Sequence, residues 1–479
     1  MKARMVGAAA CMALAMSCSR ATPPSPTTPA EPAPPVLASV EPADLDRYIA
    51  AVVEANRAVG VNVGVMRNGE VVLAKGYGLA NVERQSPVTP DTLFAIGSVT
   101  KQFTCSVALQ LEQEGRLSFA DPVAKYEPRL TRAGDITLRD LGNHVSGYRD
   151  YYPLDFVDRP MAADRPAGEV WRDFASRPLD FEPGSRYSYS NTGYLLLGHV
   201  AEVAGREPFA QALERRLLKP FGLAHTRFEP TRGEPGLADG YTPMGLGKVL
   251  PAVPEGRGWI DAAGGLWSTP SDLMTWDLAL MDGKVLSSSS WKTMTTPRTL
   301  TDGRSSAYGC GQSIRDRGAV LVLAHSGGVS GFGARNAFIP ASRSAVVVMA
   351  NSDWSSGVLD AIQEAVLAKL MPAADAPSVA GPAAEEAALD MLRQIRAGQV
   401  DRSKLSDEYG AFLTAERLVA MQQSLVEAGE VARVDAGPIR ERGGLEVSTL
   451  NLVIGTTPAT TLMYRRPDGT IEEFLFYRR

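Results

Sequence analysis

The stretch Thr92-Leu93-Phe94-Ala95-Ile96-Gly97-Ser98-Val99-Thr100-Lys101 ends with a hydroxyl and an amine three residues apart. If a helix starts at Ser98, both side chains lie on one helix face, because residues three apart in a helix are neighbours. A serine hydroxyl is a weak nucleophile, and a nearby lysine activates it as a base only where burial keeps the amine neutral. Phe94, Ile96 and Phe103 offer apolar surroundings of that kind. The stretch therefore predicts an activated serine nucleophile.

Two later segments carry residue types that suit the same chemistry. Tyr189-Ser190-Asn191 is the only Tyr-x-Asn in the chain. A tyrosine near a lysine is suited to pass a proton, and an asparagine amide is suited to orient a substrate carbonyl. His325-Ser326-Gly327-Gly328 directly follows an apolar run, so we expect it after a strand, where its glycines let a substrate or another backbone approach closely. Its backbone N–H groups are candidates for an oxyanion hole.

The three segments together carry a family resemblance. Ser98-x-x-Lys101, Tyr189-x-Asn191 and His325-x-Gly327, in this order, resemble the motifs of the penicillin-recognising serine hydrolases. That family includes class C β-lactamases, D-alanyl-D-alanine carboxypeptidases, D-aminopeptidases and related esterases. The resemblance covers about Pro42 to Pro372 and includes the similar phrases Asn143 to Gly147 and Ala262 to Thr269.

The resemblance implies a role for each residue. The implied catalytic residues are Ser98, Lys101, Tyr189 and His325. Ser98 would be acylated, while Lys101 and Tyr189 would share the base and acid duties. The implied substrate-binding residues are Asn191, Ser326, Gly327 and Gly328, with the Ser98 and Gly328 amides holding the oxyanion. His325 stands where class C β-lactamases have a lysine, which is more similar to the peptidases and esterases.

These roles predict a serine hydrolase that cleaves an ester or amide, either a D-amino-acid peptide or a small ester, through an acyl-enzyme on Ser98. One alternative is a sensor that binds penicillin or peptidoglycan fragments without turnover. A weaker alternative is a β-lactamase. A conventional α/β-hydrolase would need a Gly-x-Ser-x-Gly elbow, and neither Ser98 nor His325 lies in one.

The patterning predicts an α/β (α+β) fold, which the resemblance makes β-lactamase/transpeptidase-like: an antiparallel sheet flanked by helices plus an all-helical region. Asn68-Gly69 between two apolar runs is a strong hairpin signal. Further strands are expected over 320–324, 335–339 and 344–350. Helices are expected from Pro42, from Ser98 to about Gly115, over 136–144, over 194–204 with Gly205 as the cap, and over 358–370.

The N-terminus has the features of an export signal. Lys2 and Arg4 precede an apolar run over 5–16, which is too short to span a bilayer permanently. Residues 1–18 are therefore expected to be a signal peptide. The end of this segment also resembles a bacterial lipoprotein box, so either Cys18 is lipidated or the signal is cleaved in the ordinary way. We expect an exported bacterial protein, either periplasmic or anchored to the inner or outer membrane through the Cys18 lipid.

Composition divides the remaining chain. Residues 19–41 are rich in proline and form a predicted linker, followed by a hydrolase domain over 42–372. A second linker is predicted over 373–384. A small α+β domain with no recognisable catalytic motif is predicted over 385–479, with helices over 385–397 and 415–427 and strands over 445–454, 460–465 and 471–477.

Charge and side-chain counts exclude several function classes. The formal net charge is −5, with no basic block, which argues against nucleic acid and favours a small-molecule or peptide substrate. Four scattered histidines, without His-Glu-x-x-His or Cys-x-x-Cys, predict no metal site, and no cofactor is expected. Cys105 and Cys310 remain in the mature chain, either paired or free.

Overall fold

The structure is a computed structural model that describes residues 36–152, 157–243, 248–317, 320–353, 355–371, 379–437, 439–442 and 445–478. The predicted signal peptide with Cys18, most of the linker over 19–41 and part of the linker over 373–384 lie outside the described residues. Among the helices described, none is both long enough and apolar enough to cross a membrane.

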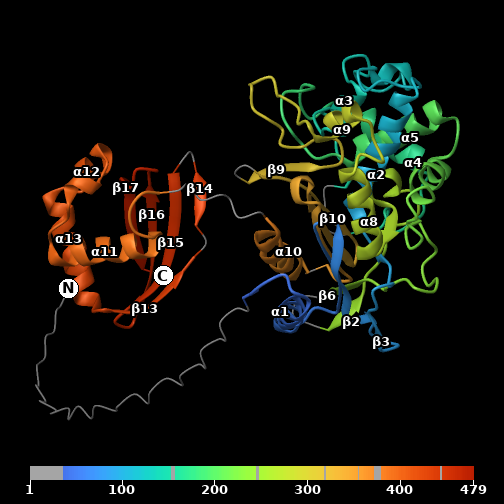
Figure 1. Ribbon diagram of the computed structural model, residues 1–479. Coiled ribbons are helices and arrows are strands. Elements are labelled where there is room, and N and C mark those ends of the chain that lie inside the picture. Colours follow the sequence, from blue (N-terminus) through green and yellow to red (C-terminus); the bar gives the residue numbers. More distant parts are fainter. Residues whose placement is uncertain are drawn as a thin grey trace, which may run out of the picture. The chain divides into compact units, whose positions relative to one another are not determined.

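A seven-stranded antiparallel sheet forms the frame of residues 36–371 (Figure 1). Asn68 and Gly69 have φ of 55° and 83°, the left-handed values that a tight hairpin needs, and they join the first two long strands as predicted. The strand order is β3-β2-β1-β12-β11-β10-β9. The strands are β1 (Gly60–Arg67), β2 (Glu70–Asn81), β3 (Ser86–Pro87), β9 (Ser313–Arg317), β10 (Val320–Val329), β11 (Phe332–Ile339) and β12 (Ser344–Ala350).

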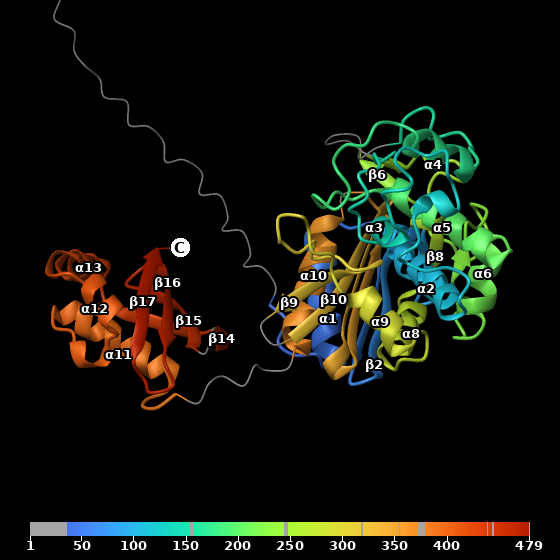
Figure 2. The same cartoon turned by 90° about the horizontal axis from the view of Figure 1, so that it is seen from above.

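The central strand β12 is buried at every position, which explains its continuous apolar sequence. Val346 and Val348 belong to one hydrophobic core, which also contains side chains of the helices α1 (Pro42–Ala55) and α10 (Ser356–Leu370). Val347 and Met349 belong to a second core, on the face covered by α8 (Pro270–Met281). Helices therefore cover both faces of the sheet (Figure 2).

The second core extends into the predicted all-helical region. This region contains α2 (Thr100–Gln113), α3 (Leu138–Gly142), α4 (Ala167–Ala175), α5 (Asn191–Gly205), α6 (Phe209–Leu213), α7 (Asp261–Gly264) and α9 (Ser288–Thr295). The region is not all-helical as predicted, because it also contains the short strands β4 (Phe94–Ala95), β5 (Arg227–Phe228), β6 (Tyr241–Pro243), β7 (Val249–Pro251) and β8 (Leu266–Ser268). The single turns are η1 (Gly97–Val99), η2 (Val123–Lys125), η3 (Glu214–Leu218) and η4 (Pro340–Ser342).

The boundaries of α5 and α3 differ from the sequence predictions. The helix expected over 194–204 begins at Asn191, because the Ser190 side chain caps it by accepting a hydrogen bond from the Gly193 N–H. Its left-handed C-terminal residue is Arg206, with φ of 54°, and not Gly205. The helix expected over 136–144 is limited to α3, which starts at a Thr137 capping box and stops before His144, whose φ of 58° is not helical.

Residues 384–478 have a sheet and a hydrophobic core of their own. Met391, Leu450, Met463 and Phe474 are central to this core. The elements are α11 (Ala384–Ala397), η5 (Arg402–Lys404), α12 (Asp407–Phe412), α13 (Ala415–Ala428), β13 (Val431–Ala436), β14 (Arg440–Arg442), β15 (Leu445–Ile454), β16 (Thr457–Arg465) and β17 (Ile471–Arg478). The predicted fold class is confirmed, including the strand-rich C-terminal part, whereas the domain boundaries stay predictions.

Candidate active site

Ser98 lies in the turn η1 and does not open a helix, contrary to the prediction. Gly97 has φ of 50°, and a Cβ there would lie 2.7 Å from the Gly328 nitrogen, so only glycine lets η1 lie this close to β10. The helix α2 begins two residues later, at Thr100. The predicted pairing still holds, because the Lys101 Nζ lies 2.9 Å from the Ser98 Oγ.

Lys101 is fully buried, and its amine has three oxygen partners. Nζ lies 2.9 Å from the Ser98 Oγ, 2.8 Å from the Asn191 Oδ1 and 2.8 Å from the Ala263 carbonyl oxygen. Burial lowers the pKa of Lys101 to about 7, and the negative charge of Asp150 opposes this shift. A large fraction of the amine is therefore neutral near neutral pH, as a general base must be.

Tyr189 lies just before α5, and its ring lies over the amine of Lys101, with Nζ 4.8 Å from the ring centroid. Burial raises the pKa of Tyr189 well above its ordinary value, and the hydroxyl of Ser98 acts in the opposite direction. No described residue makes a hydrogen bond of acceptable geometry with the Tyr189 hydroxyl. The phenol is thus a neutral, buried donor with no fixed partner beside Ser98 and Lys101.

Asn191 is the first residue of α5, and its side chain bridges two charged groups. Its Oδ1 accepts a hydrogen bond from Lys101, and its Nδ2 donates one of 3.2 Å to the Asp150 Oδ2. The backbone N–H of Asn191 donates a second bond to the Asp150 Oδ1, at 3.0 Å. Sequence reasoning missed Asp150, although it lies three residues beyond the family-like phrase that ends at Gly147.

His325 lies inside β10, paired with Asn336 of β11, and not after the strand as predicted. Its Nδ1 lies 2.6 Å from the Ser326 carbonyl oxygen and its Nε2 lies 2.6 Å from the Tyr308 hydroxyl. Because a carbonyl only accepts, Nδ1 carries the proton and Nε2 accepts from Tyr308. Burial and, next, the charge of Lys101 lower the pKa of His325 to about 3, so the imidazole is neutral.

Ser326, Gly327 and Gly328 also lie within β10. A Cβ on Gly327 would lie 1.9 Å from the Ile96 carbonyl oxygen and 3.3 Å from the Ser98 nitrogen. The glycines therefore let β10 pass directly along η1, which brings the backbone of Gly328 next to that of Ser98. This is the arrangement that a two-amide oxyanion hole requires.

A cleft of about 750 Å³ opens above Ser98. Its described lining consists of Ser98, Asp150, Tyr152, Val157, Tyr189, Asn191, Thr242, Val253, Gly328, Val329, Ser330, Phe332, Asp353 and Ser356. Ser98, Tyr189, Asn191 and Gly328 are thus brought to one surface. Lys101 lies beneath it, and His325, Ser326 and Gly327 are not among the described residues that line it. His325 instead lies behind Tyr189, with 6.3 Å between the ring centroids.

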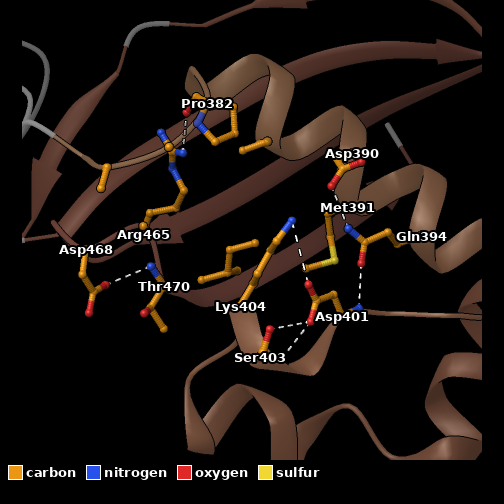
Figure 3. Close-up of a pocket in the computed structure, with 15 residues that line it drawn as sticks. Pro382, Asp390, Met391, Gln394, Asp401, Ser403, Lys404, Arg465, Asp468 and Thr470 are labelled. Carbon is orange, nitrogen blue, oxygen red and sulfur yellow. Dashed lines mark hydrogen bonds and ion pairs between the residues drawn. The ribbon is translucent and has the colours of Figure 1, made fainter.

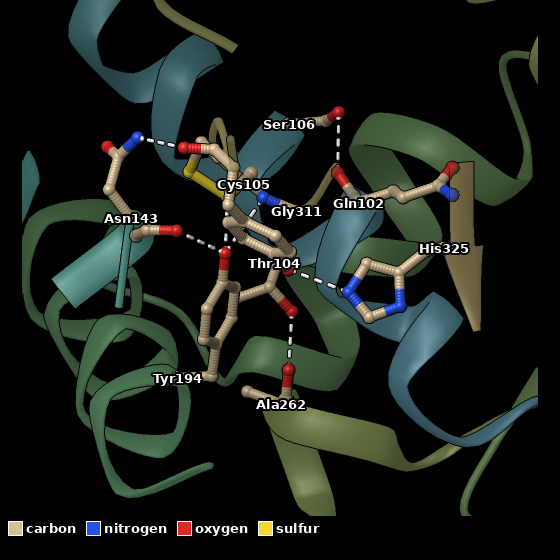
Figure 4. The surroundings of a disulfide bond; sticks show 12 residues. Gln102, Thr104, Cys105, Ser106, Asn143, Tyr194, Ala262, Gly311 and His325 are labelled. Atoms are coloured by element: carbon tan, nitrogen blue, oxygen red, sulfur yellow. Dashed lines mark hydrogen bonds between the residues drawn. A yellow bond between two sulfur atoms is a disulfide. The ribbon is translucent and has the colours of Figure 1, made fainter. Parts of the chain in front are cut away.

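Cys105 and Cys310 form a disulfide, which decides the question that the sequence left open. The bond joins α2, one turn beyond Lys101, to the segment that carries Tyr308. Figure 4 shows Tyr194 beside the bond. Its hydroxyl donates a hydrogen bond of 2.6 Å to the Gly142 carbonyl oxygen and accepts one of 2.8 Å from the Gly311 N–H. The disulfide and the two hydrogen bonds of Tyr194 therefore join α2, α3, α5 and residues 308–311.

A second pocket, of about 280 Å³, lies in the C-terminal part and contains none of the predicted site residues (Figure 3). It lies between α11, η5 and the β16–β17 turn. The polar side chains that line it are Asp390, Gln394, Asp401, Ser403, Lys404, Arg465, Asp468 and Thr470. Arg465 is held by Glu446 and by the Pro382 carbonyl oxygen, so its charge is already partnered.

The comparison with protein families decides the family. The family model described as Beta-lactamase matches residues 45–369, most of the chain. The chain belongs to the beta-lactamase family. It is therefore one of the penicillin-recognising serine hydrolases, as the resemblance predicted. The roles of its individual site residues stay predictions.

Three relatives illustrate what this family member is similar to. A Bacillus subtilis protein named as penicillin-binding protein PbpX is 31% identical over 60% of this chain and 69% of its own length. A D-aminopeptidase of Gluconobacter oxydans is 31% identical over 61% of this chain, which spans only 55% of that relative. The crystal structure of a D-stereospecific amidohydrolase from Streptomyces is 26% identical, with a TM-score of 0.58, and covers 67% of this chain and 98% of its own.

Proposed function

We propose that this protein hydrolyses amides or peptides of D-amino acids that carry a free amine, through an acyl-enzyme on Ser98. The observation that carries the proposal is the contact of 2.9 Å between the Ser98 hydroxyl and a buried lysine whose pKa is about 7. A serine activated in this way needs neither a metal nor a histidine base. Within the described ranges, no group of three or more His, Cys, Asp or Glu side chains is placed to hold a metal ion.

The geometry suits Lys101 as the base for acylation. In its neutral form the amine has two N–H donors, which the Asn191 Oδ1 and the Ala263 carbonyl accept, and one lone pair, which then faces the Ser98 hydroxyl. In its protonated form the third N–H points at Ser98 and no proton can be taken. Deprotonation of Lys101 therefore switches the pair from inactive to active.

The reaction then has two steps. The Ser98 Oγ bonds to the substrate carbonyl carbon as its proton passes to Lys101, and the carbonyl oxygen becomes an anion held by the Ser98 and Gly328 amides. The bond to the leaving group breaks as that group takes a proton through Tyr189, whose neutral phenol is replenished from Lys101. Water then attacks the acyl carbon and gives a proton to Lys101 through Tyr189. The bond between the acyl carbon and the Ser98 Oγ breaks, the carboxylic acid leaves, and the Oγ takes the proton from Lys101, which restores the Ser98 hydroxyl.

The charge of the cleft supports an amine-bearing substrate. Its lining includes Asp150 and Asp353, while none of the described lining residues is a lysine or arginine. The neutral His325 adds no positive charge. Such a surface attracts an ammonium group, and its described lining offers no cationic partner to the carboxylate of a penicillin or of a D-alanyl-D-alanine terminus. One relative is named as a D-aminopeptidase and another as a D-stereospecific amidohydrolase, and these names support a D-amino-acid substrate.

We also propose that the protein is exported from a bacterial cell, with either a cleaved signal or a lipid on Cys18 holding it at a membrane. The basic and apolar start of the chain supports export. The Cys105–Cys310 disulfide supports an oxidising compartment such as the periplasm. Mass spectrometry of the N-terminus of the purified protein tests this. A diacylglyceryl Cys18 or a new N-terminus near Cys18 is expected, and an intact Met1 would contradict export.

Substrate assays of the purified protein test the activity. We expect steady release of product from D-alaninamide and D-phenylalaninamide, much slower release from the L-forms and from N-acetylated D-forms, and little hydrolysis of nitrocefin. Ser98→Ala is the control and should be inactive on all of them. Release of one product per site without further turnover would favour the sensor alternative, and preferred hydrolysis of nitrocefin would favour the β-lactamase alternative.

A further inference from the structure

A continuous chain of hydrogen bonds leads from Asp150 to the nucleophile. Asp150 accepts from the Asn191 side chain at 3.2 Å and from the Asn191 backbone at 3.0 Å. Asn191 in turn accepts from Lys101 at 2.8 Å, and Lys101 contacts Ser98 at 2.9 Å. The family motifs contain the last three residues, and Asp150 lies outside them.

We propose that Asp150 is a positioning residue for acyl transfer, which fixes the orientation of Asn191 and balances the positive charge that Lys101 acquires when it accepts the Ser98 proton. This role rests on the acyl-enzyme chemistry proposed above.

The orientation follows from which atoms can donate. A carboxylate only accepts and the protonated amine of Lys101 only donates, so the amide of Asn191 has a single orientation that satisfies both neighbours. Its Nδ2 faces Asp150 and its Oδ1 faces Lys101. Without a carboxylate at position 150 the amide can rotate, and its NH2 group would then oppose the amine of Lys101.

Asp150 is itself held in place by backbone N–H groups. The carboxylate lies at the N-terminus of α5, where the first N–H groups of a helix lack partners and the helix dipole favours a negative charge. Its Oδ1 also accepts from the Tyr152 N–H at 3.2 Å. Burial raises the pKa of Asp150, and the N–H donors of Asn191 and Tyr152, together with Lys101, oppose that rise.

Titratable side chains from several elements face Lys101. They are His144 after α3, Tyr189 before α5, Tyr194 in α5, His325 in β10 and Asp150. Burial lowers the pKa of both histidines and raises that of both tyrosines, so these four side chains are neutral near pH 7. Asp150 is then the group among them that carries a negative charge, and its charge raises the pKa of Lys101 against the effect of burial.

Two rates measured between pH 5 and 9 test the role of Asp150. The first is kcat/KM on D-phenylalaninamide, and the second is the rate at which a fluorophosphonate probe labels Ser98. In Asp150→Asn we expect the acid limb of both profiles to shift to lower pH by about one unit or more. The reason is that Lys101 loses the neighbouring negative charge that favours its protonated form. We also expect the plateau to fall by about tenfold or more, because Asn191 loses its fixed orientation.

Two further variants separate charge from position. Asn191→Ala breaks the chain but keeps the Asp150 carboxylate, so its plateau should fall while its acid limb moves much less; it also keeps the test open if Asp150→Asn does not fold. Asp158→Asn is the matched control. Asp158 accepts from the Met161 N–H and makes no contact with Asn191 or Lys101, so both rates should match the wild type.

Each outcome has a defined meaning. Asp150→Asn with the wild-type acid limb and plateau would overturn the proposal. A lower plateau and lower melting temperature with an unmoved limb would show a structural role only, and would overturn it too. If the wild type is labelled but turns over no substrate, the proposed function fails, while the pH profile of labelling still decides the role of Asp150.

Discussion

The hydroxyl of Tyr308 donates a hydrogen bond of 2.6 Å to the Nε2 of His325, and both groups are buried. We predict that Tyr308→Phe lowers the free energy of unfolding by about 1–3 kcal/mol, because Nε2 is left buried without a donor. Urea denaturation measures this. Tyr148→Phe is the control, because the buried Tyr148 hydroxyl has no partner among the described residues and its removal should cost little. Equal stability losses in the two variants would show that the Tyr308–His325 bond contributes nothing.

The pH dependence of the wild type should report Lys101. The pKa of this amine is lowered to about 7, so below pH 7 the base is protonated and kcat/KM should fall about tenfold per pH unit. On an amine-bearing substrate kcat/KM should also fall above about pH 8, where the substrate loses its ammonium charge, whereas fluorophosphonate labelling of Ser98 should reach a plateau. His325, with a pKa of about 3, is neutral across this range and should add no limb. The measurement is kcat/KM from pH 5 to 9. Lys101→Arg, which stays protonated, should be inactive at every pH; activity of this variant would exclude Lys101 as the base.

Tyr189→Phe should separate chemistry from stability. We predict a loss of kcat/KM of about 10²–10⁴-fold, the usual scale for one acid–base group, since the phenol can no longer pass a proton to the leaving group. Because the Tyr189 hydroxyl has no hydrogen-bond partner among the described residues, the melting temperature should not fall. Kinetics and a thermal melt of the same sample measure both. A large stability loss with unchanged kinetics would contradict the proton-transfer role.

The Cys105–Cys310 disulfide should be a large contributor to stability. It links residues 205 apart in sequence, so breaking it frees a long loop in the unfolded chain. We predict that the double variant Cys105→Ala/Cys310→Ala loses about 2–5 kcal/mol of unfolding free energy. Urea denaturation with and without dithiothreitol measures the loss. The reductant should destabilise the wild type and leave the double variant unchanged, and an equal effect on both would mean that the bond is absent.

Local sequence signals determined the elements that depend on local geometry. Asn68-Gly69 predicted the first hairpin, the continuous apolar run over 344–350 predicted the central strand, and the spacing of Ser98 and Lys101 predicted their contact although Ser98 lies in a turn and not in the helix. These features depend on neighbours within a few residues, so the sequence is sufficient to find them. The residue types at Ser98, Tyr189 and His325, in that order, also indicated the family.

The tertiary structure alone decided the relationships between distant segments. It paired Cys105 with Cys310 and placed the Asp150 carboxylate within hydrogen-bond distance of Asn191. It also placed His325 behind Tyr189, with a hydrogen-bond partner at each ring nitrogen. No local pattern marks Asp150 or Tyr308, because their importance comes only from the atoms that folding places beside them. The same holds for Lys101. The sequence shows only that a lysine stands at this position, and its burial among the packed segments gives it a pKa near neutrality.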